Sequence, residues 1–126
     1  MPIQNIKLSQ KERENLIRLK RITGIKNWNT LCRWAFCLSL ANPDEPRTGK
    51  IISDSSLEMT WKVFGGKHHK IYTALLIQRC KRDGFEWSDD NLMEQFRLHL
   101  KRGINYLMID KDLKSIDGLL AKAINT

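Results

Sequence analysis

The sequence predicts a mainly helical protein with short β elements, an α+β fold that forms one domain over residues 1–126. Three observations support this prediction. Apolar residues recur at helical spacing in several long stretches, alternating residues mark only short strands, and capping residues and glycines lie at the expected helix ends. We expect a strand-helix-turn-helix module at residues 1–41, a loop at 42–49, and a β-hairpin followed by further helices at 50–126.

The first module begins with a predicted edge strand at residues 3–8. Ser9 and Glu12 have the spacing of a capping box, so a helix is expected to start there. Gly24 supplies the left-handed residue that ends this helix after about Thr23. Asn29 is the expected cap of a second helix over residues 30–40.

The second helix is apolar on nearly every side, because Arg33 and Ser39 are its only polar members between residues 31 and 40. Such a helix must be covered all round, and a short chain rarely has enough interior for that. It could be the central helix of a monomer. We favour a helix that is buried partly by another subunit, and the expected oligomer interface consists of Trp34, Phe36 and Leu38.

The order strand, helix, glycine turn, helix is that of a ribbon-helix-helix module, in which two chains pair their strands and interlock their helices. After the proline-containing loop, residues 50–53 and 57–64 flank a turn and predict a β-hairpin. Further helices are expected from Ile71 to about Arg82, from Ser88 onward with Gly103 as a candidate kink, and from Ile116 to Ile124.

The charge of the chain indicates a polyanionic partner. Lys and Arg number 22 against 14 Asp and Glu, a formal charge of +8. The excess is concentrated in residues 1–50, where ten basic and four acidic side chains give +6. Nucleic acid is the commonest polyanion, and a merely solubilising surface would not need this asymmetry.

Two groups of basic residues are candidate DNA-binding sites. Lys20, Arg21 and Lys26 flank the first turn and have no acidic residue near them in the sequence. Lys67 and Lys70 follow Gly65 and Gly66, which predict either a phosphate-binding turn before a helix or a strand-to-helix turn that only needs glycine. The turn is not a nucleotide-binding P-loop, because the upstream glycine is missing and His68 replaces the Ser or Thr.

No catalytic or metal-binding motif is present, so we expect no enzyme activity, no metal and no cofactor. Cys32, Cys37 and Cys80 lack the C-x-x-C spacing and are interpreted as small buried residues in a reducing compartment. His68 and His69 are adjacent and cannot chelate one metal together. No apolar segment suggests a signal peptide or a membrane span, and we expect a cytoplasmic protein.

Several segments together resemble the DndE family, the small member of the bacterial DNA phosphorothioation machinery. They are the Lys7–Lys11 opening, the Gly24 turn, the 34–40 helix, the Phe64–Lys67 turn and the segment from Ile71 to Gly84. The resemblance spans nearly the whole chain. It implies a ribbon-helix-helix-like subunit that forms tetramers and binds duplex DNA, preferably nicked, through surface lysines. It also implies partners among the other modification proteins, which replace a non-bridging phosphate oxygen with sulfur, and no defined catalytic motif.

The sequence therefore predicts a non-catalytic DNA-binding subunit that contacts backbone phosphates with little base readout. Two alternatives remain at this stage. A ribbon-helix-helix repressor would read bases with side chains of the first strand, for which Gln4, Asn5 and Lys7 are the candidates. A small enzyme acting on nucleic-acid ends would use a histidine between Lys67 and Lys70 as acid or base.

Overall fold

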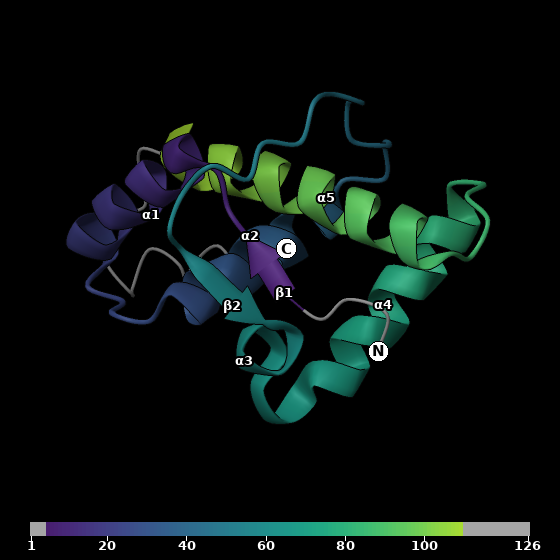
Figure 1. Ribbon diagram of the computed structural model, residues 1–126, viewed down its shortest axis with the longest axis horizontal. Helices are drawn as coiled ribbons and strands as arrows, with labels where there is room; N and C mark the ends of the chain where they lie inside the picture. Colours follow the sequence, from purple (N-terminus) through teal and green to yellow (C-terminus); the bar gives the residue numbers. More distant parts are fainter. Residues whose placement is uncertain (1–4, 110–126) are drawn as a thin grey trace.

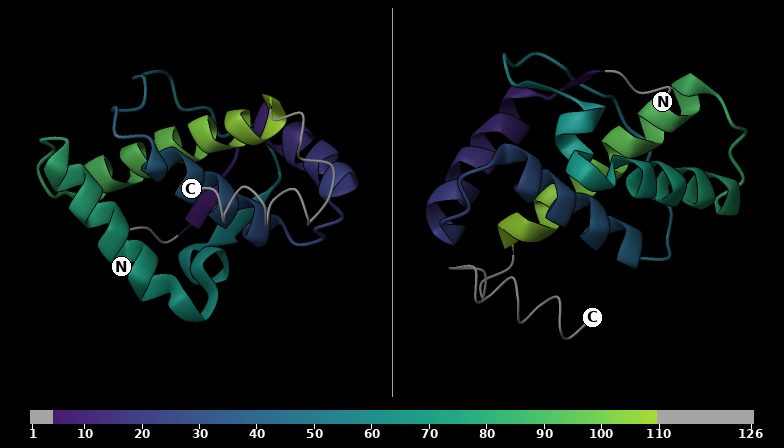
Figure 2. Two further views of the ribbon diagram at one scale, coloured as in Figure 1. Left: turned by 180° about the vertical axis from the view of Figure 1, so that it is seen from behind. Right: turned by 90° about the horizontal axis from the view of Figure 1, so that it is seen from below.

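The computed structural model describes residues 5–109, so the helix predicted at 116–124 lies outside the described residues. Two helices, α2 (Trp28–Ala41) and α5 (Asp89–Ile109), cross at the centre of the molecule (Figures 1 and 2). Around them lie β1 (Asn5–Lys7), α1 (Gln10–Thr23), β2 (Glu58–Thr60), α3 (Trp61–Gly65), the 3-10 turn η1 (Gly66–His68) and α4 (His69–Arg82). The mainly helical α+β class is confirmed.

The local signals at the first helix are confirmed. The Ser9 hydroxyl accepts a hydrogen bond from the Glu12 N–H at 3.0 Å, and the Glu12 carboxylate accepts one from the Ser9 N–H at 2.9 Å. Gly24 follows α1 with φ +76°, the left-handed conformation that glycine adopts without steric cost. These bonds satisfy groups that the helix leaves unpaired at its ends.

The second helix starts earlier than predicted, and Asn29 does not cap it. The cap position is Asn27, whose side chain makes no capping hydrogen bond. Asn29 lies inside α2 and donates from Nδ2 to the carbonyl of Val63 at 3.1 Å. The amide side chain is thus used for a contact with a distant segment, which the local pattern could not reveal.

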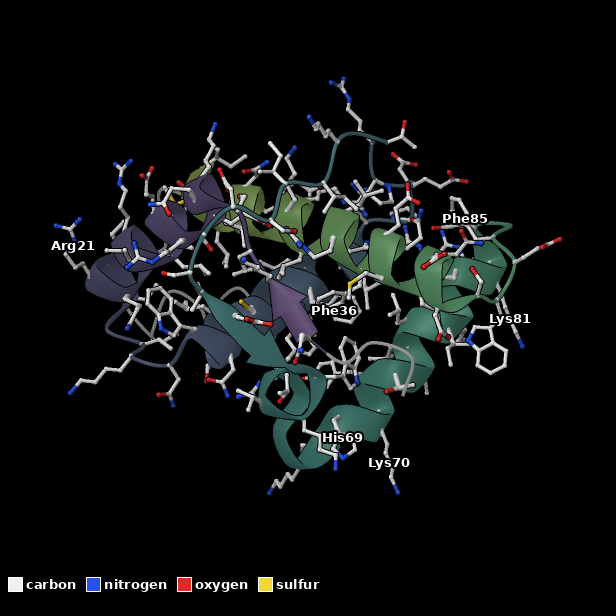
Figure 3. The ribbon with its side chains drawn as sticks, viewed as in Figure 1. Arg21, Phe36, His69, Lys70, Lys81 and Phe85 are labelled. Atoms are coloured by element: carbon white, nitrogen blue, oxygen red, sulfur yellow. The ribbon has the colours of Figure 1, made fainter. Side chains whose placement is uncertain are left out.

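The chain itself covers much of α2. Its buried face consists of Leu31, Cys32, Ala35, Phe36 and Ser39, and α1, α3 and α5 all pack against it. Phe36 is fully buried in the middle of the molecule (Figure 3), so its assignment to an oligomer interface is wrong. Trp34 and Leu38 are half-buried and keep some accessible surface.

The predicted β-hairpin at 50–64 is not formed. Residues 50–53 are not a strand, and β2 ends at Thr60, whose hydroxyl accepts a hydrogen bond from the Val63 N–H and begins α3. Helical geometry then places Trp61 and Phe64 on the buried side and leaves Val63 52% exposed. A capping threonine therefore ends the alternation that had predicted a longer strand.

The small sheet is antiparallel and is formed within one chain. Ile6 faces Met59 in the register, and both side chains point into the core. The Leu8 N–H donates to the Leu57 carbonyl, and the Ser55 N–H donates to the Leu8 carbonyl. The strand-helix-helix order is present, and β1 pairs with β2 of its own chain, whereas a ribbon-helix-helix module pairs its strand with that of a second copy.

An aromatic cluster joins α2, α3 and α5 in the core. The Phe64 ring lies 5.0 Å from the rings of Trp61 and Phe96 and 5.8 Å from that of Phe36, measured between centroids. Edge-to-face and tilted pairs of this kind are worth about 0.5–1.5 kcal/mol beyond the burial of their area. The cluster fixes the short helix α3 against the two central helices.

Gly103 is the point of closest approach between α2 and α5. The helix α5 is continuous through this residue. A Cβ atom here would lie 1.7 Å from the Ala35 carbonyl oxygen, an impossible distance. Gly103 therefore permits close helix packing, and this requirement explains a glycine inside a long helix.

The α2–β2 loop, residues 42–57, has no regular secondary structure and is held by arginines. Arg79 of α4 donates to the carbonyls of Leu40, Asn42 and Asp44 at 2.7–3.0 Å. Arg102 of α5 also donates to the Asp44 carbonyl, at 2.8 Å. Within residues 5–109, no helix combines the length and the apolar character needed to span a lipid bilayer.

The contact at Gly103 gives the first prediction. Gly103→Ala should lower the free energy of unfolding by about 2 kcal/mol or more, because overpacking a core commonly costs 1–3 kcal/mol. Alanine would otherwise favour the helix by about 1 kcal/mol. The measurement is urea denaturation, with Gly49→Ala as control because a Cβ there meets nothing within 4 Å. A Gly103→Ala protein as stable as the parent would contradict the described packing.

Candidate nucleic-acid interface

The first predicted basic group lies around the turn from α1 to α2. Lys20 and Arg21 belong to the last turn of α1, and Arg21 projects from that end of the molecule (Figure 3). The Lys20 ammonium lies 4.0 Å from the centroid of the Trp28 ring, a cation–π contact that orients it. Arg21 and Lys26 are exposed. The three side chains thus surround one turn, as the sequence predicts.

The second predicted group surrounds the glycine turn between α3 and α4. Lys67 and Lys70 are both exposed. A Cβ on Gly65 would lie 2.7 Å from the Cβ of His69, and Gly66 has φ +60°. The chain therefore needs glycine at both positions for its own geometry. Phosphate binding by this turn stays a prediction.

The two groups are not brought together. Arg21 lies at the end of α1, whereas Lys70 lies at the start of α4, on a different side of the molecule (Figure 3). They form two separate basic areas on one chain.

The structure also reveals three lysines that the sequence analysis did not select. Lys11 of α1, Lys50 of the α2–β2 loop and Lys101 of α5 line one pocket of about 150 Å³. They come from three distant segments, so no spacing in the sequence could group them.

Both ion pairs found among residues 5–109 involve a buried arginine. Arg97 donates to Glu12 at 3.0 Å and Arg79 to Asp83 at 2.9 Å. None of the five predicted basic residues, and none of the three pocket lysines, pairs with an acidic side chain in the part of the chain that the structure describes.

In the described region, burial favours the uncharged forms of His99, Cys32 and Cys80. Burial lowers the pKa of His99 to about 4, and the charges of Arg79 and Arg102 act in the same direction. Burial raises the pKa of Cys32 to about 12 and that of Cys80 to about 11. The imidazole is thus neutral and both thiols protonated near pH 7. Cys37 is exposed, which corrects the expectation that all three cysteines are buried.

Among residues 5–109, no three His, Cys, Asp or Glu side chains are grouped so that they could hold a metal ion. His68 is exposed, and the backbone carbonyl of His69 accepts hydrogen bonds from Trp61 and Thr73. Within residues 5–109, the structure is therefore mainly helical and carries basic side chains without an ion-pair partner in three areas.

Comparison with known proteins identifies the family. The family model described as "DNA sulphur modification protein DndE" matches residues 5–115. The chain belongs to the DndE family, which takes part in DNA phosphorothioation. No curated protein sequence matches the chain.

Two solved structures share the fold. DndE from Escherichia coli B7A, described as involved in DNA phosphorothioation modification, is 22% identical and superposes with a TM-score of 0.72, over 85% of this chain and 98% of that chain. A DndE mutant with two glycines changed to lysine is 20% identical, with a TM-score of 0.64 over 82% and 95% of the two chains. At these identities the likeness shows the fold alone.

Proposed function

We propose that this protein is a non-catalytic, DNA-binding accessory subunit of the DNA phosphorothioation machinery. It binds duplex DNA through surface lysines, prefers nicked duplex, and holds the other modification proteins on the DNA. Family membership supports the place in the machinery.

The observation that carries the DNA-binding part is the unpaired basic surface. The recorded ion pairs place acidic groups beside buried arginines, while Lys26, Lys67 and Lys70 are exposed with no acidic partner in the described region. Lysine ammonium groups near backbone phosphates release counterions, which gives affinity without sequence information.

The repressor alternative has less support. Its recognition strand would pair with the same strand of a second copy. Here β1 already pairs with β2, and Ile6 points into the core, so only Asn5 and Lys7 face outward from this strand. The enzyme alternative needs a histidine placed by a second catalytic group, and the described surroundings of His68 and His69 do not supply that support.

Self-assembly is a further part of the proposal, with a tetramer as the expected state. Trp34, Cys37 and Tyr72 line a shallow groove of about 260 Å³ on the outer side of α2, together with Thr30 and Arg33. A half-buried tryptophan is a frequent anchor of protein interfaces. With Phe36 excluded, Trp34 and Leu38 are the residues proposed to contact another copy.

The DNA-binding proposal predicts a defined response to salt. Lys20→Ala, Lys26→Ala, Lys67→Ala and Lys70→Ala should each weaken binding to one nicked duplex. Each should also lower the slope of log affinity against log salt by about one, similarly for every DNA sequence. The measurement is fluorescence anisotropy across a salt series, with nicked, intact and single-stranded DNA compared for the parent protein.

Lys81→Ala is the matched control, because Lys81 is also exposed but lies at the opposite end of α4 from Lys70 (Figure 3). It should keep the parent affinity and slope. Parent-like values in all four test variants would show that these surfaces do not contact DNA.

The assembly proposal predicts that the parent protein is an oligomer by multi-angle light scattering. Trp34→Glu and Leu38→Glu should shift it toward the monomer, because a charge would be buried without a partner at the interface. Trp87→Glu is the control, since Trp87 is 65% exposed and lies outside the groove. Circular dichroism checks that each variant is folded. A monomeric parent, or folded variants that keep the parent mass, would contradict the proposed interface.

A further inference from the structure

A pocket lined by three lysines is formed by the start of α1, residues 50–54 of the α2–β2 loop and the middle of α5. Its volume of about 150 Å³ is large enough for several water molecules, and therefore for a phosphate group. Lys11, Lys50 and Lys101 are exposed side chains at this pocket, so they can move toward a ligand. The pocket is separate from both predicted basic groups.

The two acidic side chains of the pocket are already engaged. Glu12 Oε1 accepts hydrogen bonds from the Ser9 N–H and from Arg97, and Asp54 Oδ1 accepts one from the Gln10 N–H at 2.7 Å. Both carboxylates therefore stabilise the start of α1. The three lysines keep no acidic partner among the described residues.

Arg97 also lines the pocket and is held in place by several hydrogen bonds. It is 5% exposed. Its Nη1 donates to the Lys7 carbonyl and the Ser53 hydroxyl, and its Nη2 donates to Glu12 and the Ile52 carbonyl. Among the described residues, its Nε has no acceptor and Glu12 Oε2 has no donor. Because Arg97 and Glu12 form an ion pair, this guanidinium offers the pocket an unpaired Nε N–H and not a free charge.

The net charge of the pocket favours a doubly charged anion. Three lysines and Arg97 oppose Glu12 and Asp54, which leaves +2. Ser9 also lines the pocket, so the positive end of the α1 dipole adds to the field. A phosphate monoester carries nearly two negative charges near neutral pH, whereas a backbone phosphodiester carries one and lies on the side of a stiff duplex.

We propose that this pocket binds a terminal phosphate group, with Lys11, Lys50 and Lys101 as its ligands. The phosphate is that of a DNA strand end or free inorganic phosphate, which share this chemistry. The proposal that the phosphate belongs to a DNA strand end rests on the proposed DNA-binding function. The pocket then acts as an end-binding site beside the lysines that contact the duplex.

The first arm of the test uses duplexes that carry a 5′-phosphate, a 3′-phosphate or only hydroxyl ends. The parent should bind at least one phosphorylated duplex about tenfold more tightly than the hydroxyl-ended one, the effect of one charge-assisted hydrogen bond. Lys50→Ala and Lys101→Ala should remove this preference and leave affinity for the hydroxyl-ended duplex within about threefold of the parent. Lys81→Ala should keep the preference.

The second arm measures thermal stability in inorganic phosphate against sodium chloride of equal ionic strength. A higher midpoint in phosphate for the parent and Lys81→Ala, but not for Lys50→Ala or Lys101→Ala, supports a phosphate site even if no duplex binds. That result would separate failure of the DNA-binding proposal from failure of the pocket. No end preference and no phosphate effect on the parent, or equal effects in all variants, would overturn the inference.

Discussion

Arginine guanidinium groups that donate to backbone carbonyls hold this fold together around its long α2–β2 loop. A loop without regular structure leaves its own carbonyl groups unpaired, and burying them without partners is costly. Arg79 satisfies the carbonyls of Asn42 and Asp44, and Arg97 satisfies that of Ile52. The planar fork of an arginine presents several donors in fixed directions, which a lysine cannot reproduce.

This use of arginine has a consequence for the surface. Each of the two recorded ion pairs is between a buried arginine and an acidic side chain, Asp83 or Glu12. Removing one member of a buried pair typically costs 3–5 kcal/mol, because the other charge is left without a partner. Some of the acidic side chains therefore pair with buried arginines and not with surface lysines. The exposed lysines keep their charge for a binding partner.

The features that the sequence predicted correctly are local. The capping box at Ser9 and the glycine after α1 depend on residues within a single turn, so their geometry follows from spacing alone. The buried stripe of α5 follows from helical periodicity in the same way. Membership of the DndE family followed from several segments considered together, and the family match confirms it.

Most of the features that were missed depend on contacts between distant residues. Nothing near Phe36 in the sequence shows that rings from α3, α4 and α5 would surround it within one chain. The hairpin prediction failed because Thr60 acts as a helix cap and not as a strand residue. Lys11, Lys50 and Lys101 line one pocket because the fold brings three distant segments together. No local sequence pattern could therefore predict their grouping.

Hydrogen exchange of the loop amides tests most directly whether arginines hold the loop. Arg79→Lys and Arg102→Lys remove the fork but keep the charge, and Arg18→Lys is the exposed control. In both test variants, the amides of Asn42 and Asp44, which donate to the Ser39 carbonyl and the Asn42 side chain, should exchange about tenfold faster, the effect of losing roughly one hydrogen bond. Exchange in α1 should stay at the parent rate. Unchanged exchange of the loop in both variants would contradict the role assigned to these arginines.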